Sequence, residues 1–387
     1  MSRVPVIHVI TKLEFGGAQQ NTLYTVASLD RERFEPVLLT GPGGYLMPDA
    51  RDLGLDLRTV PSMKRVIRPG TDAAAYRELG RMLEPYRDRP SIVHTHSSKA
   101  GILGRWAARK VRVPVIIHSI HGFGFTPAQS PPRRFLFRTA ERLTSRVTDH
   151  FIAVSEANRI DGVRYGLFEP ERCSVIRSGF NLEEFKGAGA MDDELRSELG
   201  TGPGVPLVLM VACLKPQKSP LDFARVASLV RRKVPEARFL MAGDGDLKDA
   251  LLREVDRLGI DDVFFPLGWR DDVPGLMKSS RVVVLTSKWE GLPRVIPQAK
   301  AVGRPVVATA VDGSVEAIRD GIDGYLCSPG DVGSMADRVI RLLKDKDLAD
   351  RMGREGSRVV DEFDQDTMVR KQEELYERLL LEKGIRI

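Results

Sequence analysis

Short apolar runs rich in β-branched residues alternate with longer segments of helical periodicity along the chain. The runs are apolar on both faces, which is typical of strands buried in a parallel sheet, and the segments between them predict covering helices. The runs lie at residues 4–10, 36–40, 91–96, 114–120 and 150–155 in the first half, and at 206–214, 238–243, 263–268, 282–287 and 305–310 in the second. This alternation predicts an α/β protein with two doubly wound, Rossmann-like domains.

The length of the chain and one polar stretch indicate where the domains divide. A chain of 387 residues suits two domains. Residues 186–204 are polar and glycine-rich around one short helical pattern, which predicts a linker. We therefore expect one domain over residues 1–185 and a second over residues 186–364.

The spacing of the cysteines and the length of the longest apolar run indicate the cellular compartment of the protein. Cys173, Cys213 and Cys327 are widely spaced and suggest neither a disulfide framework nor a zinc ribbon, so a reducing compartment is expected. The N-terminal residues lack the apolar core of a signal peptide, and the longest apolar run, residues 205–214, is far shorter than the ~20 residues of a spanning helix. These features predict a soluble, cytoplasmic protein.

The basic excess lies in the first half of the chain. Residues 1–185 hold 27 Lys and Arg against 19 Asp and Glu, whereas the remainder holds 32 against 34. Five arginines accompany an apolar stripe in residues 131–150, a pattern of helices that lie on anionic lipid. An ordinary amphipathic helix packed on its sheet is the alternative. No nucleic-acid-binding motif is present, so we expect no nucleic-acid partner. From the arginines and the apolar stripe we expect peripheral attachment at the inner face of the cell membrane.

Ligands of doubly wound sheets bind beyond the carboxyl ends of the strands, so the turns there are candidate sites. After the first strand, Gly16 and Gly17 either let a ligand approach anion-attracting amides at a helix start or form a plain tight turn.

Four histidines follow or occupy later strands of the first half. His94 and His96 share one strand face, and His118 and His121 lie on the next predicted strand. No carboxylate or cysteine ligand accompanies them. We therefore interpret the imidazoles as hydrogen-bonded and expect no metal.

The turns of the second half carry the stronger set of residues. Lys215 and Lys218 suit neutralisation of a diphosphate, although a solvated basic loop has the same pattern. Gly243 and Gly245 predict a tight strand-to-helix turn, with Asp246 capping the helix.

Residues 289–307 place Glu290 in a Gly-Leu-Pro turn and a neutral Gln298 eight positions later. Pro293 suits the first turn of a helix, which would leave the amides of the turn free for phosphate. If residues 290–298 were all helical, they would rise by about 12 Å at ~1.5 Å per residue, so the two side chains could bind different parts of one ligand.

The chain resembles glycosyltransferase family 4 over nearly its whole length. The resemblance is carried by eleven segments in one order: GGAQ, HTHSSKAGILGR, HGFGF, VSEANR, VIRSGFNLEEF, LKPQKSP, GDGDL, LGWRDDV, WEGLPRVIPQA, GRPVVATAVDG and DGYL. It implies a GT-B fold, with the acceptor in the first domain, the donor mainly in the second, and a retaining reaction without an essential metal or another cofactor. It also implies that a helix at 365–387, whose apolar stripe includes Met368 and Leu375, packs back on the first domain.

The same resemblance implies roles for single residues. Three are candidate catalytic residues: His121 matches the histidine beside the transferred sugar, Glu290 the acid that contacts its hydroxyls, and Lys218 the lysine that binds the diphosphate. Gln298 stands where a second acid usually holds the ribose. The expected donor-binding residues are Gly16, Gly17, Lys215, Lys218, Gly243, Asp244, Arg270, Glu290, Gly291, Leu292, Arg294 and Gln298.

Three positions depart from the family pattern. Cys213 replaces an arginine that helps to hold the diphosphate, Ser219 replaces a common glycine, and Gln298 replaces the second acid. We expect Lys215 or Arg294 to supply the lost positive charge.

The expected function is transfer of a sugar from a nucleotide diphosphate sugar, with a UDP-sugar favoured, to a saccharide or lipid-linked saccharide in the synthesis of a cell-surface polysaccharide or glycolipid. The expected route is a same-face displacement in which the departing diphosphate takes the acceptor's proton, and a covalent intermediate on Glu290 is the alternative chemistry. A nucleotide-sugar epimerase or hydrolase and a non-catalytic nucleotide-sugar-binding protein are the rival functions. A dinucleotide oxidoreductase is disfavoured because no Gly-x-Gly-x-x-Gly follows the first strand.

Overall fold

The computed structural model describes residues 3–126, 129–202 and 204–386. The chain divides into two compact units, residues 1–179 with 365–387, and residues 180–364. The second unit begins before the boundary expected after residue 185, because the amide of Phe180 already donates to the carbonyl of Phe363 within it. Pro203 of the expected linker and Ile387 of the expected C-terminal helix lie outside the described residues.

The described part of the first unit contains a seven-stranded, wholly parallel sheet in the order β3-β2-β1-β4-β5-β6-β7. Its strands are β1 (Val4–Ile10), β2 (Phe34–Thr40), β3 (Asp56–Thr59), β4 (Ile92–His96), β5 (Val115–Ile120), β6 (His150–Ala153) and β7 (Cys173–Val175). All five strands expected in this half are present. The sequence did not predict β3 and β7, because these short edge strands are partly exposed and lack an apolar run.

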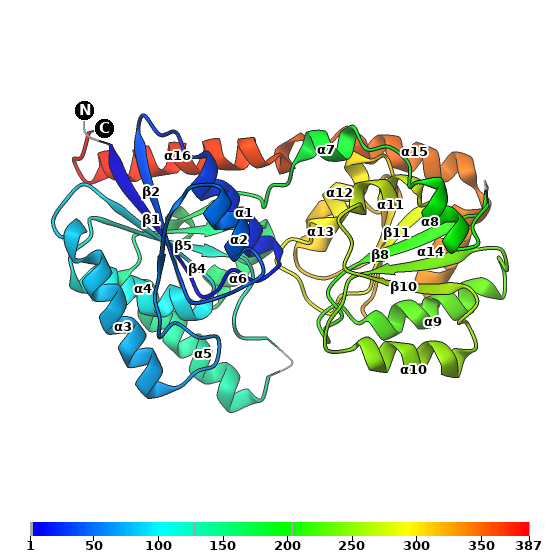
Figure 1. Ribbon diagram of the computed structural model, residues 1–387, viewed down its shortest axis with the longest axis horizontal. Coiled ribbons are helices and arrows are strands. Elements are labelled where there is room, and N and C mark those ends of the chain that lie inside the picture. The colour runs from blue at the N-terminus through cyan, green and yellow to red at the C-terminus, as the bar shows by residue number, and fades with distance from the viewer. Residues whose placement is uncertain (1–2, 127–128, 203, 387) are drawn as a thin grey trace. The chain divides into compact units, whose positions relative to one another are not determined.

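Helices lie on both faces of this sheet (Figure 1). They are α1 (Gly17–Ser28), α2 (Met47–Asp52), α3 (Pro69–Leu83), α4 (Ser98–Lys110), α5 (Pro131–Thr144), α6 (Glu156–Arg164) and α16 (Gln365–Glu382), with 3₁₀ turns η1 (Glu84–Tyr86), η2 (Ser145–Val147) and η3 (Pro170–Arg172). The C-terminal α16 packs its apolar side, including Val369, Tyr376 and Leu380, into a core formed with β1, β4 and β5. The helix therefore belongs to the first unit, although 185 residues of the second unit separate it in sequence.

The described part of the second unit contains a six-stranded parallel sheet in the order β10-β9-β8-β11-β12-β13. Its strands are β8 (Leu207–Val211), β9 (Arg238–Ala242), β10 (Phe264–Gly268), β11 (Val282–Leu285), β12 (Val306–Thr309) and β13 (Gly324–Cys327). Five coincide with predicted runs, and the short edge strand β13 was not expected. In both sheets the strand order reverses beside the first strand, the arrangement that leaves a ligand crevice at the carboxyl edge.

Helices also cover this second sheet on both faces (Figure 1). They are α7 (Leu182–Lys186), α8 (Asp193–Glu198), α9 (Pro220–Arg231), α10 (Lys248–Leu258), α11 (Val273–Ser279), α12 (Val295–Ala301), α13 (Gly313–Ala317), α14 (Val332–Lys344) and α15 (Lys346–Ser357), with η4 (Asp361–Phe363). Asp192, Asp331 and Asp345 start α8, α14 and α15 by accepting a hydrogen bond from a first-turn amide. Within the described residues, no helix is long and apolar enough to cross a membrane.

Candidate active site

Glu290 lies in the loop between β11 and α12 of the second unit. Its carboxylate is nearly buried, with 5% of the side chain exposed, and the Lys218 ammonium lies 2.5 Å from Oε1. The Ser287 hydroxyl donates to the same oxygen at 2.6 Å. The structure thus brings together two of the three predicted catalytic residues, which are 72 positions apart in sequence. Such an ion pair holds both groups in one orientation at the carboxyl edge of the sheet.

The backbone of the Glu290 loop is anchored by the loop that precedes α13. Glu290 donates its amide hydrogen to Asp312 Oδ2 at 2.6 Å. The Gly313 amide donates to the Gly291 carbonyl at 3.2 Å. A Cβ at Gly313 would lie 2.2 Å from that carbonyl oxygen, so only glycine allows this approach. Sequence reasoning missed the role of Asp312, although its Val-Asp-Gly segment was one of those that carried the resemblance.

The Lys218 loop is tied to the strand that leads to Glu290. The Thr286 hydroxyl, just after β11, lies 2.9 Å from the Lys218 carbonyl and 3.0 Å from the Ser219 carbonyl. Ser219 has a left-handed backbone with φ of 46°, a conformation that favours glycine, and its hydroxyl donates to Asp222 at 2.6 Å. Ser219 therefore keeps the backbone conformation of the family glycine but under some strain. The hydrogen bond to Asp222 offsets this strain.

The turn after β9 contains the expected pair of glycines. Gly243 and Gly245 have φ of 134° and 154°, and a Cβ on either would lie within 2.7 Å of a backbone oxygen. The prediction that Asp246 caps the next helix was wrong. The helix α10 begins at Lys248 after Leu247, because the Leu247 amide is held by the Leu214 carbonyl.

The structure also corrects the shape expected around Pro293. The helix α12 starts at Val295, so residues 290–294 form a loop and Pro293 precedes the helix. The rise calculated for a continuous helix over residues 290–298 therefore does not apply. Proline restricts the residue before it to extended conformations, which favours a loop at Leu292. Gln298 lies within α12 and is partly exposed.

The charged side chains among the expected donor-binding residues differ in their ion-pair partners and in their burial. Arg270 makes a two-point contact with Asp272 at 2.8 and 2.7 Å, and Asp244 pairs with Lys248 at 3.2 Å. Burial lowers the pKa of the Arg294 guanidinium to about 10, so the group is still charged at neutral pH. Replacement of the family arginine by Arg294 or Lys215 stays a prediction.

In the first unit, Gly16 and Gly17 stand at the beginning of α1, as predicted. Gly16 precedes the helix, and its carbonyl accepts the first helical hydrogen bond, from the Gln20 amide. The first turn contains no acidic side chain, so its amides keep their attraction for anions.

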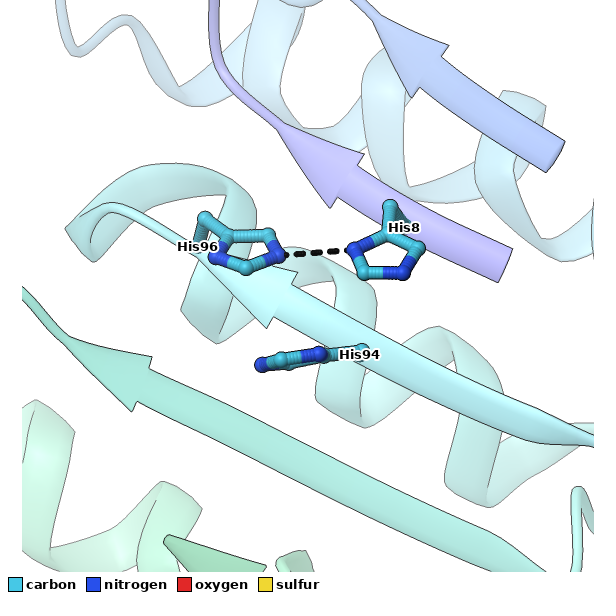
Figure 2. Close-up of side chains that lie close together, drawn as sticks. All are labelled: His8, His94 and His96. Carbon is cyan, nitrogen blue, oxygen red and sulfur yellow. Dashed lines mark hydrogen bonds between the residues drawn. The ribbon is translucent and has the colours of Figure 1, made fainter. Parts of the chain in front are cut away.

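His121 lies directly after β5 and is one member of a histidine cluster. His121 Nε2 lies 3.2 Å from His96 Nδ1, and His96 Nε2 lies 3.0 Å from His8 Nδ1. Figure 2 shows His8 and His96 facing each other from adjacent strands, with His94 beside them. Sequence reasoning missed His8, because a single histidine within an apolar strand has no local signal of a partner.

His118 lies on β5, as predicted, but outside the cluster of the other histidines. His118 faces the opposite side of the sheet, where its ring lies against Gly101 of α4 and bonds Thr95 at 2.9 Å. Successive residues of a strand point to opposite faces, so Ser119 and His121 share the side of His94 and His96, whereas His118 does not.

Three histidines lie as close together as the ligands of one metal ion would. His8, His94 and His96 have ring nitrogens within 4.8 Å of one another. Both nitrogens of His94 are engaged, with the Tyr376 hydroxyl at 2.6 Å and the Ser119 hydroxyl at 2.8 Å. The facing nitrogens of His8 and His96 share a hydrogen bond. This donor set suits a hydrogen-bonded network better than a cation.

Two family models match the chain. The model described as "Glycosyl transferases group 1" matches residues 191–359, and that described as "Glycosyl transferase 4-like domain" matches residues 16–179. The chain is 30% identical over 385 residues, 99% of each protein, to UDP-Gal:alpha-D-GlcNAc-diphosphoundecaprenol alpha-1,3-galactosyltransferase of Escherichia coli. It is 23% identical over 357 residues to N,N'-diacetylbacillosaminyl-diphospho-undecaprenol alpha-1,3-N-acetylgalactosaminyltransferase of Campylobacter jejuni, covering 90% of this chain and 93% of that relative.

A solved structure has the same fold. The crystal structure of HepE from Anabaena in complex with UDP and glucose matches with a TM-score of 0.81 at 20% identity, covering 96% of this chain and 98% of that one. This likeness confirms the predicted fold class of two Rossmann-like α/β domains.

Proposed function

The chain belongs to the group 1 glycosyltransferases, and from this premise we propose that it transfers a hexose from a UDP-sugar to a sugar carried on a polyprenyl diphosphate, with retention of configuration. The names of both relatives specify an acceptor linked to diphosphoundecaprenol, and one specifies UDP-galactose as donor. A lipid-linked acceptor of this kind suits the synthesis of a cell-surface polysaccharide or glycolipid. The observation that carries the proposal is the partly buried Glu290–Lys218 pair, which combines a hydroxyl-binding carboxylate with a phosphate-binding cation.

The proposed mechanism is mainly electrostatic. Lys218 and helix-start amides stabilise the negative charge that grows on the departing diphosphate. Glu290 accepts hydrogen bonds from hydroxyls of the transferred sugar, because Ser287 and Lys218 both bind its Oε1 and hold the carboxylate in one orientation. The departing diphosphate oxygen takes the proton of the acceptor hydroxyl on the same face of the sugar. This route requires neither a metal ion nor another cofactor.

The test is a transfer assay with purified protein. A panel of UDP-sugars is incubated with N-acetylglucosaminyl-diphosphopolyprenol. The mass of each product and the anomeric configuration of its new linkage are then determined. We expect one hexose to be added, with the anomeric configuration of the donor retained. Conversion of donor in the absence of acceptor would instead favour an epimerase or hydrolase, and donor binding without turnover would favour a binding protein.

We further propose that α5 attaches the protein to anionic lipid. Phe135, Leu136 and Leu143 on this helix are 65%, 62% and 47% exposed, so these three apolar side chains are not packed against the sheet. Arg134 and Arg138 line a cavity of about 380 Å³ beside Phe135. Exposed apolar groups next to arginines suit the boundary between lipid headgroups and acyl chains.

Replacing Arg133 and Arg134 by glutamate is expected to weaken binding to anionic vesicles. Each basic residue near such a surface contributes about 1 kcal/mol, so removing two costs at least about 2 kcal/mol, or roughly thirtyfold in partitioning. The measurement is flotation with phosphatidylglycerol vesicles at low salt. The control is Arg351→Glu with Arg354→Glu on exposed positions of α15, which changes the net charge equally. Equal binding by both double variants, or no binding by the unaltered protein, would contradict the proposal.

Gln298→Ala is expected to weaken donor binding with a smaller effect on turnover at saturation. Losing one partner of a hydrogen bond typically costs ~1–3 kcal/mol, or roughly a five- to hundredfold rise in the Kd of UDP. An interaction made equally in ground and transition states leaves kcat nearly unchanged. Calorimetry with UDP and transfer kinetics measure the two effects. Gln298→Glu restores the family acid and is expected to keep activity, whereas unchanged UDP affinity in Gln298→Ala would show that this side chain does not bind the donor.

A further inference from the structure

Three imidazoles in series join the interior of the first sheet to its carboxyl edge. His8 comes from β1, His96 from the end of β4, and His121 directly follows β5. The hydrogen bond from His8 Nδ1 to His96 Nε2 is 3.0 Å long, and that from His96 Nδ1 to His121 Nε2 is 3.2 Å. Figure 2 shows the first of these contacts. The central ring therefore uses both of its nitrogens within the series.

All three rings are neutral at physiological pH. Burial lowers the pKa of His8 to about 3 and that of His121 to about 4, and it lowers the pKa of His96 well below its ordinary value. A neutral imidazole has one N–H donor and one acceptor nitrogen. Because His96 must donate through one nitrogen and accept through the other, both hydrogen bonds point the same way along the series. Only two arrangements satisfy this condition.

The two ends of the series decide between the arrangements. His8 Nε2 and His121 Nδ1 are both buried and have no hydrogen-bond partner among the described residues. If protons point towards His8, its Nε2–H is left without an acceptor inside a fully buried residue. If they point towards His121, the free N–H is on a residue that lines a cavity of about 240 Å³. Either arrangement leaves one N–H and one bare acceptor at the ends, and an N–H without a partner is the rarer of the two in protein interiors. We therefore place the N–H at His121, where a ligand in the cavity can accept from it, and the bare acceptor at His8 Nε2.

The surroundings hold the central ring in place. The ring of His94 lies 4.3 Å from that of His96, and its own nitrogens are fixed by Tyr376 of α16 and by Ser119 of β5. The planes of the His8 and His96 rings are nearly parallel, with 7° between them. A ring flip of His96 would break both hydrogen bonds of the series, so its orientation is specified by packing and by hydrogen bonding together.

We propose that His8 and His96 are positioning residues that keep His121 in the Nδ1–H tautomer, so that His121 acts as a fixed hydrogen-bond donor to an oxygen of the donor substrate and not as a base. This inference rests on the proposed function only where it names the substrate. The tautomer of a histidine is set by the hydrogen bond that its other nitrogen makes, which here is the bond from His96. His121 then accepts no proton from the acceptor hydroxyl, in agreement with a route in which the departing diphosphate takes it.

The tautomer is measured without any substrate. In protein labelled with ¹⁵N at its six histidines, long-range ¹H–¹⁵N spectra distinguish protonated from bare ring nitrogens. The His121 signals are assigned as those missing in His121→Asn. We expect Nδ1–H for His121, Nδ1–H for His96 and Nδ1–H for His8 across pH 6 to 8. An Nε2–H tautomer at His121, or a mixture of both, would overturn the proposal. This result stands apart from the proposed function, which fails separately if the unaltered protein transfers no sugar.

Kinetics test whether the series matters for turnover. His96→Leu removes the donor to His121, whereas the amide nitrogen of His96→Asn stands near the position of Nδ1 and can still donate. We expect His96→Leu to lower kcat roughly tenfold to hundredfold, the scale of a misplaced contact, with the Kd of UDP unchanged and with most of kcat recovered in His96→Asn. His150→Leu is the control, because His150 is a buried histidine of β6 that bonds Ser174 outside the series. Equal losses in all three variants would show a merely structural role.

Discussion

Glu290→Ala is expected to lower the rate of sugar transfer by roughly 10²- to 10³-fold while UDP still binds, the scale seen when one group that stabilises a transition state is removed. The lost contacts belong to the sugar and the reacting centre, whereas the nucleotide keeps its own. Lys218 is 21% exposed, so water can solvate its ammonium once the carboxylate is gone, and the variant is expected to fold. The measurements are transfer kinetics and calorimetry with UDP.

The matched control for this variant lies in the same unit. Glu254 of α10 is also buried and also paired, with Arg225 and Arg257, and these arginines hold the pKa of its carboxyl at about 2. Glu254→Gln therefore removes a comparable ion-paired carboxylate away from the Glu290 loop and is expected to retain transfer. Near-normal turnover in Glu290→Ala would refute the role given to this acid. Equal losses in both variants would point to stability instead.

Truncation after Phe363, which removes α16, is expected to prevent the first unit from folding. Six side chains of the helix are buried in the core of that unit, namely Met368, Val369, Leu375, Tyr376, Leu379 and Leu380. At ~1.5–3 kcal/mol each, their burial contributes up to roughly 9–18 kcal/mol, which matches or exceeds the ~5–15 kcal/mol of a typical domain. The truncation also removes the hydroxyl of Tyr376 from His94 Nδ1.

Hydrogen exchange and thermal melting test this expectation. Amides of β1, β4 and β5 are expected to lose protection, and transfer activity is expected to disappear. Truncation after Lys383 is the control, because it leaves all of α16 in place. A shortened chain that melts cooperatively at its normal temperature and still transfers sugar would show that the helix is dispensable.

The parallel strands were predictable because they carry the signal that their environment requires. Strands such as β1, β5 and β11 are covered on both faces, so most of their residues are apolar, and the pattern shows in the sequence. The edge strands β3 and β7 are partly exposed and lack an apolar run, whereas the edge strand β13 is mostly buried but has only four residues, too few to show a pattern. The start of α12 was also misplaced, because Pro293 is compatible both with a first helical turn and with the loop that precedes one.

Part of the candidate site was readable from local sequence and part was not. Lys218 and Glu290 stand in turns directly after strands, where a parallel sheet collects side chains at one edge, and the structure brings them together. The sequence placed His118 and His121 on one predicted strand, and their odd separation directs the two side chains to opposite faces of the sheet. Asp312 was missed because its partner is the backbone amide of Glu290, a contact that residue types do not reveal.

By itself the sequence determined the fold class, ten of the thirteen strands that the structure describes, and the turns that carry the lysine and the acid. These properties follow from hydrophobic periodicity and from turn chemistry, which act over a few neighbouring residues. Tertiary structure alone decided that His8 meets His96 across 88 positions of sequence, and that α16 completes the core of the first unit. Such contacts depend on which strands become neighbours in the sheet and on which face each side chain takes, and burial in the folded core then sets the hydrogen-bonding and charge state of the groups that meet there.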